Sequence, residues 1–190
     1  TVANSGKAGV NAGAINFVVS NLGGSSANVT LKDDTATTVN VSSGAATAYD
    51  SIGGSANAVN AGSRSYIVLD TAKATSVNFS NDKAVNLAAS TLTAATTITA
   101  SGSGSLNLGT VGSASDKLTL VDGSAATGAI TATYSATNAT ASTAHNLTFK
   151  GGAGNDVVTI AGTINSTVNT TTAATVQNVI QLGAGNDTVL

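Results

Sequence analysis

The sequence contains no cysteine, proline, methionine, tryptophan or glutamate. The absence of cysteine excludes disulfides and thiolate metal sites. The absence of proline favours long hydrogen-bonded ladders, because proline removes a backbone donor from a sheet. All nine acidic residues are aspartate, which is common in turns and binds hard cations, whereas glutamate favours helices. These absences together favour β structure joined by turns.

Charge is also scarce. Charged residues make up 8% of the chain, against about 25% in an ordinary globular domain. Six lysines and Arg64 are scattered singly, so no basic stripe is present and we expect no nucleic-acid partner. No apolar run approaches the roughly 18 residues of a membrane-spanning helix, so we expect no membrane insertion. A start at Thr1 without methionine predicts a processed product or an excised piece, and its beginning shows no cleavable secretion signal.

Short apolar-polar-apolar units recur along the chain. Each unit is a period-2 alternation, which predicts a short strand with one buried face. Clusters of small polar residues, such as 23–26, 51–54 and 101–104, lie between the units and predict turns. The segments 81–83 and 115–117, each with an Asp-Lys pair, predict solvated turns. The units are Ile15-Asn16-Phe17, Val29-Thr30-Leu31, Val39-Asn40-Val41, Val77-Asn78-Phe79, Val85-Asn86-Leu87, Leu106-Asn107-Leu108, Leu118-Thr119-Leu120, Leu147-Thr148-Phe149 and Val158-Thr159-Ile160.

The fold class that this pattern favours is all-β, as a parallel β-solenoid or β-roll-like stack of short strands. Small side chains suit thin, closely stacked layers, and Ser, Thr and Asn stacked from coil to coil can hydrogen-bond one another. The segment from Ala84 to Ala95 is predicted as strand and turn rather than helix. An antiparallel β-sandwich is the alternative, because strand spacing alone does not decide between the two.

One sharp motif lies near the end of the chain. The segment from Gly151 to Thr159 matches the calcium-binding nonapeptide pattern Gly-Gly-x-Gly-x-Asp-x-apolar-x at every fixed position. The segment from Leu182 to Leu190 repeats it, with Leu182 in the first glycine position. Two copies of Gly-Ala-Gly-Asn-Asp rarely arise by chance, although ordinary Gly-Asn-Asp turns remain the alternative.

The chemistry of calcium explains this spacing. Glycines let the backbone turn with positive φ and aim carbonyl oxygens inward, and each aspartate adds a carboxylate. Val158 or Val189 then anchors the following strand in the core. Oxygen ligands suit Ca²⁺, so the candidate metal-binding residues are Gly151, Gly152, Gly154, Asp156, Gly183, Gly185 and Asp187.

The nonapeptides, together with strands rich in Thr, Ala, Ser and Asn, resemble bacterial surface-layer proteins of the RTX type. The specific motifs cover only the last forty or so residues. The resemblance implies a structural, self-assembling component of the bacterial cell surface that is exported, stabilised by calcium and partnered by copies of itself. A cell-surface polysaccharide is a further expected partner. Other functions consistent with it are a calcium-dependent adhesin and a non-catalytic region of a secreted RTX enzyme.

The spacing of the two copies departs from the family. In the family's β-roll, loops on one edge recur about every 18 residues, whereas these copies lie farther apart. Residues 165–172 could form an insertion between them, and whether both loops share one ion is left open. We divide the chain into a solenoid-like segment, 1–145, and the start of a nonapeptide region, 146–190.

Catalytic patterns are weak throughout, so we expect no enzyme. His145 is the single histidine, and no Gly-x-Ser-x-Gly elbow occurs. Asp33 and Asp34 are adjacent, so on a strand their side chains would point to opposite faces, and a turn or one ligand of a weak cation site is the better interpretation. A carbohydrate-binding module would need aromatic platforms, but the three phenylalanines lie in apolar alternations and Tyr49 stands alone.

Overall fold

The computed structural model describes residues 2–4, 13–19, 28–44, 64–88, 90, 92–111, 117–135, 147–161 and 179–190. Within these residues all regular structure is β, and no helix there is long and apolar enough to cross a membrane. The strands are β1 (Val2–Asn4), β2 (Ala14–Val18), β3 (Val29–Asp33), β4 (Thr38–Ser43), β5 (Ser65–Asp70), β6 (Ser76–Asn81), β7 (Val85–Leu87), β8 (Thr97–Gly102), β9 (Leu106–Val111), β10 (Leu120–Ala126), β11 (Ile130–Ser135), β12 (Thr148–Lys150), β13 (Val157–Ala161), β14 (Val179–Gln181) and β15 (Thr188–Val189).

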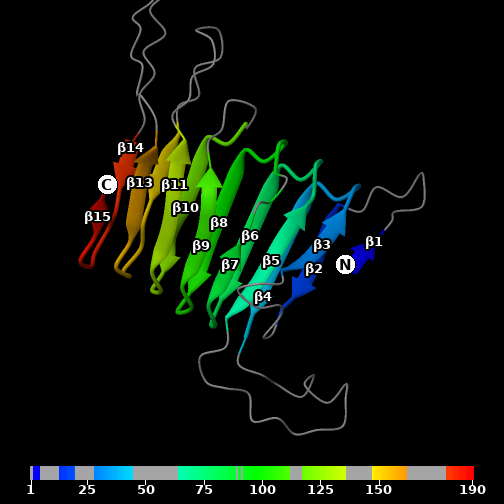
Figure 1. The fold of residues 1–190 in the computed structure, drawn as a ribbon, viewed down its shortest axis with the longest axis horizontal. Coiled ribbons are helices and arrows are strands. Elements are labelled where there is room, and N and C mark those ends of the chain that lie inside the picture. The colour runs from blue at the N-terminus through cyan, green and yellow to red at the C-terminus, as the bar shows by residue number, and fades with distance from the viewer. Residues whose placement is uncertain are drawn as a thin grey trace, which may run out of the picture.

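The strands form two parallel sheets. One sheet has eight strands and holds the odd-numbered ones in sequence order, and the other has seven and holds the even-numbered ones. Each strand therefore pairs with the strand two places along the chain, and the two sheets lengthen together from β1 and β2 at one end to β14 and β15 at the other (Figure 1). This is a β-solenoid, as predicted, and its parallel pairing excludes the antiparallel sandwich.

The core lies between the two sheets and is built from stacked apolar columns. One column of the seven-stranded sheet shows the principle, because its members are register partners from coil to coil and are almost fully buried. Alternate residues of the same strands point outward, which explains the period-2 pattern of the sequence. The column runs through Val39, Val77, Ile98, Val121 and Phe149.

Most of the predicted strand units lie in strands, but several strands were missed. Leu118 and Thr119 precede β10, and β1, β5, β8, β11 and β14 had no matching unit. The segment after Ala84 is strand and turn as predicted, apart from positions 89 and 91, which lie outside the described residues. The predicted turns at 23–26 and 51–54 and the predicted insertion at 165–172 also lie outside them. Both sheets continue across position 145.

Two edges of the solenoid carry the connections between the sheets. We call one the glycine edge; it holds the connections from even to odd strands at 82–84, 103–105, 127–129, 151–156 and 182–187. We call the other the threonine edge, where Thr37, Thr75, Thr96 and Thr119 precede even strands. Each of these threonines donates its hydroxyl to a main-chain carbonyl of the preceding coil. The nonapeptides lie on the glycine edge.

Candidate metal site in the stacked Gly-Asn-Asp loops

The two nonapeptide loops lie on neighbouring coils. Residues 151–156 connect β12 to β13, and residues 182–187 connect β14 to β15. Because β12 pairs with β14 and β13 with β15, the second loop lies directly above the first. The amide of Ala184 donates to the carbonyl of Gly152 at 2.8 Å. The long sequence separation of the copies is therefore one turn of the solenoid, and residues 162–178 connect β13 to β14.

Asp156 links its own loop to the coil below. Its carboxylate is fully buried, Oδ1 accepts the backbone N–H of Ile130 at 2.7 Å, and Oδ2 accepts that of Gly152 at 2.9 Å. A buried N–H without an acceptor costs about 1–3 kcal/mol. The aspartate of the motif therefore has a structural role that requires no metal.

Asp187 repeats part of this arrangement one coil higher. Its Oδ1 accepts the backbone N–H of Asp156 at 2.9 Å, just as Asp156 accepts that of Ile130. Beside it, the side-chain oxygen of Asn155 accepts the N–H of Asn186 at 2.9 Å. The Gly-Asn-Asp sequence thus builds a vertical ladder of side-chain acceptors.

The glycines of the loops are required chiefly by close stacking. A Cβ on Gly152 would collide with the carbonyl oxygen of Ala126, one on Gly183 with that of Gly152, and one on Gly185 with that of Gly154. Positive φ was predicted for all of these glycines. It occurs in the second loop, at Gly183 (86°) and Gly185 (127°), whereas Gly151, Gly152 and Gly154 lie outside the left-handed region. In the first loop, space rather than backbone conformation demands glycine.

The electrostatics of the stack leave negative charge without a counter-charge. Burial raises the pKa of Asp156, the backbone donors Ile130 and Gly152 oppose that rise, and the nearby charge of Asp187 adds to it. Among the described residues, the ion pairs join Lys32 or Lys150 to other carboxylates, and no lysine or arginine pairs with Asp156 or Asp187. A cation between the loops would relieve both the burial cost and the repulsion.

The two loops bring together oxygen atoms of the kind that calcium binds. Each carboxylate oxygen has two lone pairs, so the hydrogen bonds to Asp156 leave acceptor capacity, and among the described residues one hydrogen bond reaches the Asp187 carboxylate. The carbonyl oxygen of Leu182 and Oδ2 of Asp156 both lie close to Gly151, so oxygen atoms of the two loops are near one another. Oxygen-only ligation by carboxylates and carbonyls is what Ca²⁺ prefers. The described residues include no cluster of three or more His, Cys, Asp or Glu side chains, so carbonyls would complete the coordination.

The hydrophobic anchors of the two motifs differ. Val158 is buried in the core, as predicted. Val189 is 48% exposed because β15 ends the eight-stranded sheet and no described coil covers it. Among the described residues, the anchor of the second nonapeptide is therefore not buried as predicted.

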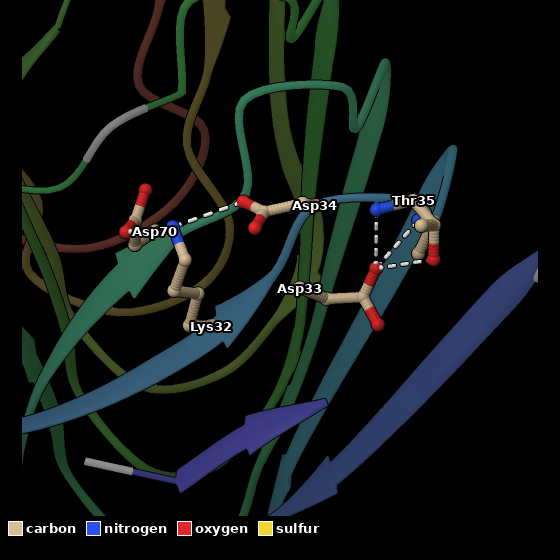
Figure 2. Close-up of polar contacts among 6 residues, drawn as sticks. Lys32, Asp33, Asp34, Thr35 and Asp70 are labelled. Carbon is tan, nitrogen blue, oxygen red and sulfur yellow. Dashed lines mark hydrogen bonds and ion pairs between the residues drawn. The ribbon is translucent and has the colours of Figure 1, made fainter. Parts of the chain in front are cut away.

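The adjacent carboxylates Asp33 and Asp34 lie where β3 meets the threonine edge, and Figure 2 shows that they point apart. Asp33 is buried and accepts the N–H of Thr35 at 2.7 Å and that of Ala36 at 2.6 Å. Asp34 lies 2.9 Å from the ammonium of Lys32, which also contacts Asp70 at 2.7 Å. Hydrogen bonds to Asp70 and then Asp34 raise the pKa of Lys32. The turn interpretation is confirmed, and Lys32 supplies the positive charge here.

Three further sequence predictions concern polar and aromatic residues. Phe17, Phe79 and Phe149 are buried, as predicted. The turn predicted at 81–83 was wrong for Asn81, which is buried at the end of β6 with both side-chain polar atoms unpaired. His145 and Tyr49 lie outside the described residues, as does Asp116, predicted to be in a solvated turn.

Asn155 is the site residue that the sequence reasoning missed. It was treated as a variable position of the nonapeptide, yet its side chain bridges two coils. The signal was present, because the same Asn precedes the Asp in both copies.

Comparison with protein-family models, with curated proteins and with solved structures finds no match.

Proposed function

We propose that this chain is part of an extracellular structural scaffold of the bacterial cell surface, of the surface-layer type, whose C-terminal coils are clamped together by calcium. The observation that carries the proposal is the stack of two Gly-Asn-Asp loops, which brings Asp156 and Asp187 onto neighbouring coils without a lysine or arginine partner among the described residues. The likeness of the nonapeptides to RTX surface-layer proteins supports it. Asp156, Asp187 and carbonyls of both loops would hold the ion.

Calcium would act by joining coils. It neutralises the carboxylates and ties main-chain oxygens of one loop to those of the next, so the ion is bound by the stacked state and released when the coils separate. A ligand that binds only the native state stabilises it by mass action. Calcium would thereby set whether the last coils are formed.

Self-association is the second part of the proposal. Among the residues that the structure describes, β1 and β2 are the outermost strands at one end of the sheets and β14 and β15 at the other. Open edges present unpaired backbone groups, which a soluble enzyme must protect and a scaffold can use. Copies of the same chain are therefore the proposed main partner, with a surface polysaccharide as a possible anchor.

Light scattering at increasing protein concentration, with calcium and with a chelator, tests the scaffold. We expect calcium to promote ordered assemblies that electron microscopy resolves as sheets or filaments. A protein that stays monomeric at high concentration in calcium would contradict self-assembly. Calcium-dependent adhesion to glycans by a monomer would instead favour an adhesin.

A further inference from the structure

A cavity of about 350 Å³ opens near the threonine edge, far along the chain from the nonapeptide loops. Its described walls come from β7, β8 and β9, from Ala88, Ser90, Leu92 and Ala95 between β7 and β8, and from Leu118 before β10. The larger side chains that line it are Leu87, Leu92, Ile98, Leu108, Val111 and Leu118.

The cavity lies where two irregularities of the solenoid meet. Strand β7 ends at Leu87 although its neighbours β5 and β9 each have six residues. Beyond it the hydroxyl of Ser90, rather than a main-chain oxygen, accepts the N–H of Leu69 at 3.0 Å. Strand β9 bulges at Gly109, which has a φ of 65° and is where its register with β11 shifts. The early strand end at Leu87 and the bulge at Gly109 both border the cavity.

The lining determines what can occupy the space. None of the lining residues that the structure describes is charged. The Ser90 hydroxyl already has two hydrogen bonds, because it also donates to the carbonyl of Ala88 at 3.0 Å. Apolar atoms form the larger part of the described lining and polar atoms the rest, so the space suits an occupant that is mainly apolar and carries a polar group. The volume lies within the range of small-molecule sites, about 300–1,000 Å³.

We propose that this cavity is a binding site for an uncharged, mainly apolar small molecule of about the volume of two or three fused rings. The molecule would be held by dispersion contacts with the leucines and Ile98, with the hydroxyl of Thr110, an exposed residue of the lining, available to a single polar group. The site is independent of the proposed calcium loops, because none of the lining residues belongs to them.

The test uses N-phenyl-1-naphthylamine, a neutral probe that becomes fluorescent in apolar surroundings. It is titrated into the 190-residue chain with chelator present, so that calcium plays no part. The filled variant is Ala95→Leu, since Ala95 is a buried residue of the lining. The matched control is Ala161→Leu, an exposed position on β13 outside the lining.

We expect saturable binding by the wild type and by Ala161→Leu, and binding at least tenfold weaker by Ala95→Leu. Ala88→Leu, a half-buried position of the lining, should weaken binding in the same way and serves if Ala95→Leu does not fold. Without any variant, the probe should raise the melting temperature of the wild type, because a ligand that binds only the native state stabilises it. Absence of saturable binding by the wild type, a lowered melting temperature, or unchanged binding by folded filled variants would overturn the proposal.

Discussion

The glycine edge contains two kinds of connection, which differ in the group that accepts the backbone N–H at the start of an odd-numbered strand. In the plain turns, the N–H at the start of an odd strand donates to a main-chain carbonyl of the coil above: Ser65 to Ala84, Val85 to Ser105 and Leu106 to Ala129, each at 2.9 Å. In the Gly-Asn-Asp loops the carboxylates of Asp156 and Asp187 accept the corresponding N–H groups instead.

The difference shows what a longer loop provides. The connections 82–84, 103–105 and 127–129 are short, and a main-chain carbonyl accepts the N–H at the strand start. The connections 151–156 and 182–187 are longer, and a carboxylate takes the place of that carbonyl. The aspartate restores that contact with a charged acceptor, which forms stronger hydrogen bonds than a neutral one. It also introduces the negative charge that a cation can join.

The largest expected effect comes from adding a side chain at a glycine where the main chains of neighbouring coils lie very close together. Replacing Gly152 by Ala places a Cβ against the main-chain oxygens of Ala126 and Gly123, which cannot move aside. We expect the free energy of unfolding to fall by about 3 kcal/mol or more in chemical denaturation. Gly13→Ala is the control, since nothing lies within 4 Å of its Cβ, and it should change stability by about 0.5 kcal/mol or less. Equal effects would show that the loops do not stack.

Asp156→Ala separates the carboxylate ladder from an ordinary turn. It leaves the N–H groups of Ile130 and Gly152 without their acceptor, so we expect a loss of about 2–4 kcal/mol in chelator, measured by urea denaturation. Asp82→Ala is the control, because Asp82 is an exposed aspartate in a plain turn of the same edge. If the two variants lose the same small amount of stability, Asp156 is an ordinary turn residue.

Asn155→Ala tests the weaker step of the ladder. Its side chain accepts the N–H of Asn186, and losing one exposed hydrogen bond should cost about 0.5–1 kcal/mol. Asn186→Ala is a matched control, because Asn186 holds the same motif position in the last described coil, with no described coil above it. A larger effect at Asn186 than at Asn155, in the same denaturation assay, would contradict the ladder.

Asp122 offers a carboxylate outside the loops, on the outer face of β10. Hydrogen bonds from the hydroxyl and the N–H of Ser124, and then Lys150, hold its pKa below the ordinary value of 3.8. The ionised form is therefore favoured by folding, so its contribution is present above the unfolded pKa and is lost as pH falls through the lower folded pKa. Between about pH 5 and pH 2, the wild type should lose up to about 1 kcal/mol more than Asp122→Asn. Parallel pH profiles of the two proteins would contradict this.

Much of this fold follows from short-range patterns. Alternations such as Val39-Asn40-Val41 and Val77-Asn78-Phe79 predict strands because one face is buried, and the side-chain amides of Asn40 and Asn78 do bond across the coils. Strand β5 was missed because Ser65 and Asp70 bound an apolar stretch without the polar centre of the other units. Strand β11 was missed because Ala132 is a small buried residue that gives little periodic signal.

The candidate site was predictable in identity but not in assembly. The nonapeptide pattern predicted Asp156 and Asp187 as candidate ligands, and their sequence separation left open whether the two loops share one ion. The sequence separation does not predict whether the loops stack, because a solenoid coil can have a longer connection without a change in strand register. The coil from β12 to β14 is such a case. The acceptor role toward Ile130 was also not readable, since Ile130 belongs to the coil below.

The central claim, that calcium joins the two stacked loops, is tested most directly by the calcium-induced shift in melting temperature of the wild type and of Asp187→Asn. Asparagine keeps an oxygen that can accept the N–H of Asp156 but removes the charge. We predict that calcium raises the melting temperature of the wild type, and that Asp187→Asn loses most of this shift while melting near the wild type in chelator. Melting curves of the wild type that coincide with and without calcium would contradict the account.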